Sequence, residues 1–371
     1  MRVRLFFFAL LFTTPLLAQS PFLPPVDYAA ELQPAFVAIG DVNNDGNLDL
    51  VTANQGNFGG GGVSVLLGRG DGTFDTALNY PMGYDVRSVA LADSNGDGEV
   101  DLAATNFNAR GRGELLVALG NGDGSFQAPK VYSAGPTPLS LAVGDFNHDH
   151  TPDVVVTADT SQPGYVVVFL GNGDGTFQGS TKYVTTRSFP VFVAVSDFNE
   201  DGNPDLAVAS EGGSVSILLG NADGTFQHQL HFFGGSILLS LAIADLNGDG
   251  HQDIVSADTA DAAVEVLLGD GNANFQFAKQ FAVLADPASV VVADFNHDGK
   301  PDIVTANPTS QNLALLFGNG DGTFQASKLF GSGPSLSVAT ADLNGDGWPD
   351  LVIAQGIANK VSVLLNVGRT Q

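Results

Sequence analysis

The chain has 371 residues, no cysteine, and 40 Asp and Glu against 14 Lys and Arg, which gives a formal net charge of −26 at pH 7. An acidic chain of this kind repels phosphate backbones, so nucleic acid is excluded as an expected partner. The lack of cysteine excludes disulfides and thiolate metal sites.

The N-terminus has the features of an export signal. Arg2 and Arg4 precede an apolar run over residues 5–12, and small residues follow as far as Ala18. The apolar run is too short to span a bilayer, and no cysteine follows it to carry a lipid anchor. We therefore expect a signal peptide over residues 1–18 and a mature protein that is secreted or held at the cell surface, without a membrane span.

A nine-residue phrase then recurs along the chain, clearest at residues 245–253, Asp-Leu-Asn-Gly-Asp-Gly-His-Gln-Asp. Its seven copies are spaced 48 to 52 residues apart and start at Asp41, Asp93, Asp145, Asp197, Asp245, Asp294 and Asp342. A near-constant period of this length is typical of a repeat architecture, which forms one cooperative unit. The sequence thus predicts a single domain over residues 19–371.

Each period predicts four strands. An alternating apolar segment leads into the phrase, and these segments are residues 36–40, 88–92, 139–144, 191–196, 239–244, 289–293 and 336–341. A second strand leaves the last Asp of the phrase, as at residues 49–54, 101–106 and 302–307. A more apolar third strand follows, at residues 63–67, 115–119, 166–170, 215–219, 264–268, 313–317 and 361–365. A Gly-Asn-Gly-Asp-Gly-Thr-Phe turn, as at residues 171–177, then leads to a short fourth strand.

Four antiparallel strands in about 50 residues form one propeller blade. The sequence therefore predicts an all-β protein, a seven-bladed β-propeller of four-stranded antiparallel blades. The seventh repeat stops before its fourth strand, while residues 22–28 match the fourth-strand passage at residues 126–132. The N-terminal strand is thus predicted to complete the last blade and close the ring, which removes an unpaired sheet edge.

The recurring phrase itself predicts cation sites. It places carboxylate or amide oxygens at positions 1, 3, 5 and 9 and a glycine at position 6, a pattern that wraps Ca²⁺. A turn alone has no need of the ninth-position carboxylate, and three aspartates in each of seven copies account for 21 of the 40 acidic residues. We expect up to seven Ca²⁺ ions with a structural role. The third site is expected to be strained, because His150 replaces the glycine there. The candidate ligands are Asp41, Asn43, Asp45, Asp49, Asp93, Asn95, Asp97, Asp101, Asp145, Asn147, Asp149, Asp153, Asp197, Asn199, Asp201, Asp205, Asp245, Asn247, Asp249, Asp253, Asp294, Asn296, Asp298, Asp302, Asp342, Asn344, Asp346 and Asp350.

These phrases and turns together resemble the FG-GAP/VCBS repeat family, the propeller type of integrin α-subunit heads and of many secreted bacterial proteins. The resemblance covers roughly residues 20–366. It implies that the loops carry Ca²⁺ and that the propeller is an extracellular recognition module.

The predicted topology places the cation loops and the Gly-rich turns on one face, so the remaining loops share the other face, where binding residues usually lie. Arginine and aromatic residues in these loops suggest a patch for an anionic group, a sugar ring or a peptide side chain. A solvated surface with aromatics filling the blade junctions is the competing interpretation. The candidate residues are Phe58, Tyr84, Arg87, Phe107, Arg110 and Arg112, with Arg187 on the same face.

We expect a monomeric, non-catalytic recognition or adhesion module for a surface polysaccharide or protein. Two alternatives remain open. A polysaccharide-degrading lyase or glycosidase would use Asp258, Asp261 or Asp286, and a catalytic pair should then lie within about 10 Å. A scaffold without a ligand would instead have a flat face with no pocket.

Overall fold

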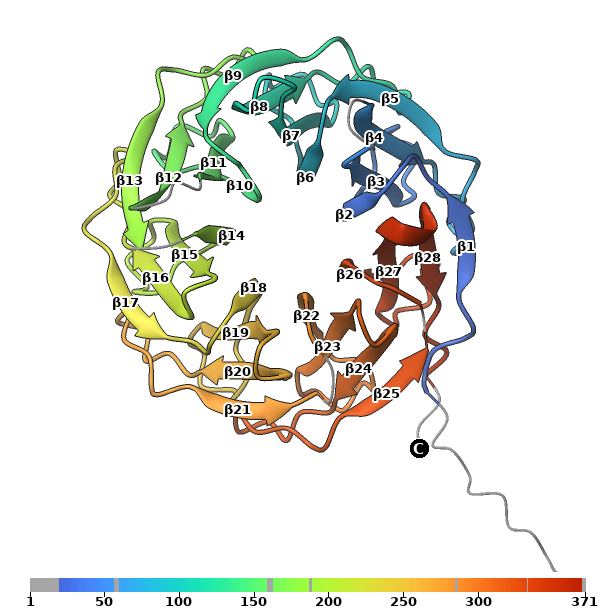
Figure 1. The fold of residues 1–371 in the computed structure, drawn as a ribbon, viewed down its shortest axis with the longest axis vertical. Coiled ribbons are helices and arrows are strands. Elements are labelled where there is room, and N and C mark those ends of the chain that lie inside the picture. Colours follow the sequence, from blue (N-terminus) through green and yellow to red (C-terminus); the bar gives the residue numbers. More distant parts are fainter. Residues whose placement is uncertain are drawn as a thin grey trace, which may run out of the picture.

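The structure, a computed structural model, describes residues 20–56, 60–158, 163–186, 189–283, 286–331 and 333–368. Seven four-stranded antiparallel sheets stand in a closed ring around a central channel (Figure 1). The prediction of a seven-bladed propeller is confirmed. The predicted signal peptide, Phe58 and Arg187 lie outside the described residues.

The strands occupy four concentric positions. The strands that line the channel are β2 (Pro34–Gly40), β6 (Val86–Ala92), β10 (Leu141–Gly144), β14 (Pro190–Ser196), β18 (Leu238–Ala244), β22 (Ser289–Ala293) and β26 (Ser337–Ala341). The second strands are β3 (Asp49–Asn54), β7 (Asp101–Phe107), β11 (Asp153–Ala158), β15 (Asp205–Ser210), β19 (Asp253–Asp258), β23 (Asp302–Asn307) and β27 (Asp350–Gln355). The third strands are β4 (Gly61–Leu66), β8 (Gly113–Ala118), β12 (Gly164–Phe169), β16 (Ser214–Leu218), β20 (Ala263–Leu267), β24 (Asn312–Leu316) and β28 (Lys360–Leu364). The outer strands are β5 (Leu78–Gly83), β9 (Lys130–Gly135), β13 (Thr181–Thr186), β17 (Leu230–Phe233), β21 (Lys279–Ala282), β25 (Lys328–Gly331) and β1 (Val26–Ala29). A short 3₁₀ helix, η1 (Gly356–Ala358), joins β27 to β28.

The second and third strands form the core of each blade. Every residue of β3, β4 and β19 is buried, because both faces of a blade pack against neighbouring blades. Strands buried on both faces favour near-continuous runs of Val, Leu and Ala rather than alternation with charged residues. This explains why the third strands are the most apolar segments of each repeat.

The N-terminal strand closes the ring as predicted. Strand β1 pairs antiparallel with β28, with Val26 opposite Val363 and Tyr28 opposite Val361. Phe22 forms a further bridge with Asn366. The last blade therefore contains both ends of the described chain, and the first and last blades meet without an open sheet edge.

Aromatic side chains join adjacent blades at the periphery. In six of the seven junctions a Tyr or Phe on an outer strand contacts the Phe that ends the Gly-rich turn of the next blade, edge to face, with centroids 5.1 to 6.1 Å apart. At the seventh junction Phe22 replaces the turn Phe and stacks on Phe330 at 5.4 Å. The Phe of each Gly-Thr-Phe turn thus has a packing role between blades.

The acidic loops and the Gly-rich turns lie on one face, as predicted. Hydrogen bonds between loops and neighbouring turns show this arrangement. The remaining loops form the opposite face, which we call the variable face. No helix within the described ranges has the length and hydropathy needed to cross a membrane.

Candidate metal loops and the variable face

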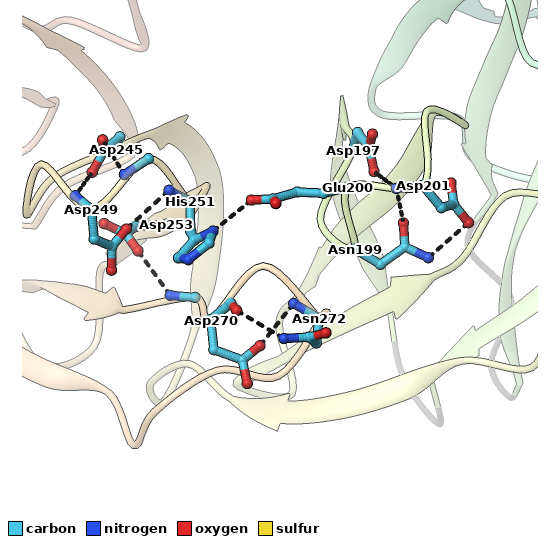
Figure 2. Close-up of polar contacts among 12 residues, drawn as sticks. Asp197, Asn199, Glu200, Asp201, Asp245, Asp249, His251, Asp253, Asp270 and Asn272 are labelled. Carbon is cyan, nitrogen blue, oxygen red and sulfur yellow. Dashed lines mark hydrogen bonds and ion pairs between the residues drawn. The ribbon is translucent and has the colours of Figure 1, made fainter.

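The acidic loops are held by hydrogen bonds from their own backbone (Figure 2). In the fifth blade the two carboxylate oxygens of Asp245 accept from the N–H groups of Gly248 and Gly250, at 2.7 and 2.9 Å. Oδ1 of Asp249 accepts from the N–H of His251 at 2.9 Å, and Asn247 Nδ2 donates to Asp249 Oδ2 at 2.8 Å. The oxygens at positions 1, 3 and 5 are thereby gathered around one small loop.

Two positions of every loop have a positive φ. Position 6 was predicted from its glycine, and His150 in the third loop adopts the same conformation, with φ 64°. The expected strain at His150 is therefore present in the backbone, since a side chain disfavours this region. Position 4 was missed by sequence reasoning. Its occupants all have φ between 55° and 75°, and they are Asn44, Gly96, His148, Glu200, Gly248, His297 and Gly345.

The ninth-position aspartate has a role in the fold itself. Asp253 is fully buried, and its two oxygens accept from the N–H of Leu246 in the loop and the N–H of Gly269 in the turn, both at 2.8 Å. The same pair of bonds, from position 2 and from the first residue of the turn, is made by Asp49, Asp101, Asp153, Asp205, Asp302 and Asp350. The sequence argument that a turn has no need of this carboxylate was therefore wrong, because Asp253 and its equivalents fasten each loop to its turn.

Burial raises the pKa of six position-9 aspartates, namely Asp49, Asp153, Asp205, Asp253, Asp302 and Asp350. The pKa of Asp253 is raised to about 6 by loss of solvent, opposed by the two backbone hydrogen bonds and reinforced by the charges of Asp249 and Asp245. The pKa values of Asp153, Asp205 and Asp350 are likewise about 6, and that of Asp302 is about 7. An ionised carboxylate at position 9 is thus costly beside two others unless a positive charge lies nearby.

The donor set of each loop fits a hard divalent cation, because it consists of carboxylate and amide oxygens. An oxygen that accepts one N–H bond retains a second lone pair for a cation. Among the described residues, however, the acidic trio whose oxygens all lie within 4.8 Å of one another is Asp258, Asp261 and Glu265, outside the loops. Within a loop, the half-buried carboxylate at position 1 and the exposed carboxylate at position 5 would have to move toward the fixed carboxylate at position 9.

Side chains at position 4 contact position 7 of the next loop around the ring. Glu200 accepts a hydrogen bond from the imidazole of His251, which raises the pKa of His251 (Figure 2). The imidazole of His297 stacks on Trp348 with centroids 3.8 Å apart. The two other contacts of this kind are Asn44 with Glu99 and His148 with Asn203. Glycine occupies position 4 at the three remaining junctions.

The channel opens on the variable face into a cavity of about 330 Å³, which we call the upper chamber. It is lined mainly by apolar side chains from the start of the inner strands, including Phe36 and Phe192. Arg87 also lines it, and the guanidinium donates from Nε and Nη2 to the carboxylate of Asp85.

The predicted patch on the second blade is only partly assembled. Tyr84 and Arg87 flank Asp85, and the backbone N–H of Tyr84 donates to the side chain of Asn106. Arg110 and Arg112 lie instead on an exposed turn, where their N–H groups bond to Asn108 Oδ1. The half-buried Phe107 precedes that turn.

Of the three aspartates of the enzyme alternative, Asp258 and Asp261 lie together, with carboxylate oxygens within 4.8 Å of each other and thus inside the expected separation of about 10 Å. Asp258 is buried and accepts from the N–H groups of Ser236 and Ile237, while Asp261 accepts from the Ser236 hydroxyl at 2.7 Å. Asp286 bonds elsewhere, to the N–H of Thr309. Sequence reasoning missed Glu265, which lies beside Asp258 and Asp261 and whose pKa burial raises to about 7. The sequence feature that could have identified Glu265 is a single acidic residue within an otherwise apolar strand.

Fold and loops together define a propeller built from loop-bearing repeats. The family profile described as "FG-GAP-like repeat" matches six overlapping stretches, residues 41–104, 95–156, 152–208, 197–256, 245–305 and 294–353. The chain belongs to this repeat family. Comparison with curated proteins gave no match.

Two solved structures similar to this chain are those of BBS1N in complex with ARL6DN. The lead-soaked crystal gives a TM-score of 0.65 at 10% identity, over 95% of this chain and 99% of that one. The mercury-soaked crystal gives 0.60 at 11% identity, over 94% and 97%. At this identity the similarity concerns the fold alone.

Proposed function

We propose that the protein is a secreted, calcium-binding recognition module that binds a protein partner through its variable face. The carrying observation is a set of four exposed apolar side chains in the loops of that face. Leu32, Phe189, Ile237 and Ile357 all lie in its loops and are 38% to 82% exposed. Apolar and aromatic residues at the centre of a surface, with arginine beside them, are typical of protein interfaces. The fold is compatible with such a role, since BBS1N was crystallised in complex with ARL6DN.

The calcium part of the proposal rests on the seven loops. Positions 1, 3, 5 and 9 of each loop would hold the ion. Its positive charge would stabilise the ionised form of the buried aspartate at position 9. Each ion would then secure a loop, its turn and the adjoining blade, a structural role.

We propose that the module is non-catalytic. A glycosidase requires two carboxyl groups that both reach the scissile bond. In the trio of Asp258, Asp261 and Glu265, the exposed fractions of Asp258 and Glu265 are 0% and 5%, so only Asp261 reaches solvent.

The test is retention of a partner on immobilised protein. Extracts of surface proteins and polysaccharides are passed over the wild type, the double variant Phe189→Asp/Ile357→Asp, and the control Phe277→Asp. Phe277 is 99% exposed but lies after a Gly-rich turn, away from the variable face. We expect a protease-sensitive ligand that the double variant loses and the control retains. Equal retention by all three, or sensitivity to glycosidase alone, would contradict the proposal.

A further inference from the structure

The upper chamber is lined by Gln55 and by two tiers of residues, one pair from each blade. The outer tier, at the mouth, contains six apolar residues and one charged residue, namely Ala35, Arg87, Leu139, Val191, Leu239, Ala288 and Leu336. The inner tier contains two phenylalanines and five serines, namely Phe36, Ser88, Ser140, Phe192, Ser240, Ser289 and Ser337. A volume of about 330 Å³ lies within the range of small-ligand pockets.

The two phenylalanines form the floor of the chamber. Phe36 on β2 and Phe192 on β14 come from opposite sides of the channel (Figure 1). Both also line a second cavity of about 330 Å³ that extends deeper along the channel. Phe36 and Phe192 therefore lie where the two chambers meet, and the upper chamber opens on the variable face.

The serines supply hydrogen-bond donors to this floor. The hydroxyl oxygens of Ser88, Ser140 and Ser289 accept N–H bonds from the inner strand of the next blade, at 3.2 to 3.4 Å. Since the oxygen is the acceptor in these bonds, each hydroxyl hydrogen remains available. Buried Ser337 Oγ has no hydrogen-bond partner within the described part of the chain. Buried polar groups normally find partners, so an acceptor inside the chamber would satisfy them.

Arg87 gives the chamber its charge. The bonds from Nε and Nη2 to Asp85 fix the guanidinium at the wall, and the Arg87 side chain is 33% exposed. Among the residues that the structure describes, no acceptor contacts Nη1. A guanidinium held in this way is suited to bind a carboxylate.

We propose that the upper chamber binds an apolar group that carries a carboxylate. The apolar body would lie against the outer-tier side chains and the two rings, and the carboxylate would bond to Arg87 and the serine hydroxyls. This inference rests on the proposed function, because it names the chemistry that the variable face recognises at its centre. The group has two sources, a free small carboxylic acid or the C-terminal residue of a protein partner.

Ligand-observed NMR titration tests the inference directly. The probes are phenylacetate with phenylacetamide as its neutral counterpart, and the peptide acetyl-Ala-Ala-Phe with a free or an amidated C-terminus. We expect both free acids to bind about tenfold or more tightly than their amides, the effect of one charge-assisted hydrogen bond. Binding by the peptide acid alone assigns the site to a protein chain end, whereas binding by both acids extends it to free carboxylates.

Two variants with matched controls locate the site. Arg87→Gln should weaken binding about tenfold. Arg69→Gln, which breaks an arginine–aspartate pair on the face opposite the variable face, should leave binding unchanged. Ala288→Asp, which places a negative charge in the chamber wall, should abolish binding, and Ala288→Asn should not. Absence of binding, equal binding of acids and amides, or insensitivity to Arg87→Gln and Ala288→Asp would overturn the inference. A partner lost with Phe189→Asp/Ile357→Asp but retained by Arg87→Gln would leave the proposed function standing and remove only the chamber.

Discussion

Oδ1 of Asp253 accepts a hydrogen bond from the backbone N–H of Gly269 at 2.8 Å, and this bond joins an acidic loop to the turn beside it. Equivalent bonds recur in all seven blades, so one carboxylate both anchors the loop and faces the proposed cation site. The conformation of the loop and its attachment to the turn therefore both depend on position 9, and cation binding would depend on it as well.

The first prediction concerns Gly269, which has to be glycine for a steric reason. A Cβ there would lie 2.3 Å from the carbonyl oxygen of Gln252. Gly269→Ala should destabilise the protein by about 3 kcal/mol, the upper range for overpacking. Gly248→Ala is the control, because its Cβ would meet nothing within 4 Å and only its φ of +75° is strained, at a cost of about 1 kcal/mol. Denaturant unfolding gives both values, and equal losses would contradict the role of Gly269.

The second prediction concerns pH in the presence of a chelator. Five aspartates of position 9 have a raised folded-state pKa, which is about 6 for Asp153, Asp205, Asp253 and Asp350 and about 7 for Asp302, against the ordinary 3.8. The folded state binds these protons more tightly than the unfolded state, so protonation of the aspartates stabilises the fold. This stabilisation is full below about pH 3.8 and is lost as pH rises through 6 to 7. In chelator the melting temperature should therefore fall from pH 5 to pH 8, by about 5 °C or more.

Calcium should remove this dependence, since a bound cation favours the ionised carboxylates. Asp249 and the other loop aspartates with lowered pKa titrate below 3.8 and do not act in this pH window. His251, whose pKa is raised, acts in the same direction as position 9. A chelated protein that gains stability between pH 5 and pH 8 would contradict the buried-aspartate account.

The third prediction concerns the exceptional third loop. His150 has φ 64° at a position where the other six loops have glycine. His150→Gly should stabilise the protein by about 0.5 to 1 kcal/mol, because relief of the left-handed strain exceeds the added chain entropy of glycine. The reverse change in the fourth loop, Gly202→His, should destabilise by a similar amount. Thermal unfolding in calcium measures the stability of both variants relative to the wild type. A destabilised His150→Gly would show that the histidine side chain stabilises its loop.

The fourth prediction concerns the contact between neighbouring loops. Glu200 raises the pKa of His251 by accepting its imidazole hydrogen bond. Glu200→Gln should lower the pKa of His251 in an NMR titration, since it removes the charge and weakens the bond. Glu99→Gln, at the equivalent contact with Asn44 in the second blade, is the control and should leave the His251 titration unchanged. An unaltered His251 titration in Glu200→Gln would show that the pair is not formed in solution.

The architecture was predictable because the acidic phrase marks every blade at the same point. Its seven copies set the number of blades, and the match of residues 22–28 to an outer strand predicted the pairing of β1 with β28. The division of loops between two faces was also predictable, because strand order alone determines it, and the structure confirms it.

Other features depend on contacts between segments that no local pattern records. The bonds of Asp253 join a loop to a turn 16 residues away, and the Glu200–His251 contact joins different blades. Arg87 was predicted as a binding residue from its position in a loop. Its place in the upper chamber, however, depends on side chains from all seven blades. The lining of a channel at the axis of a ring is fixed only when the ring closes.

Scanning calorimetry in 1 mM calcium and in excess chelator, at pH 7 with magnesium as the control cation, tests the central claim most directly. If the seven loops are structural calcium sites, linkage predicts that calcium raises stability by several kcal/mol and that the melting temperature rises with calcium concentration. Asp249→Asn should reduce the increase. An identical melting temperature in chelator and in calcium would contradict the claim that these loops hold the ring together through bound ions.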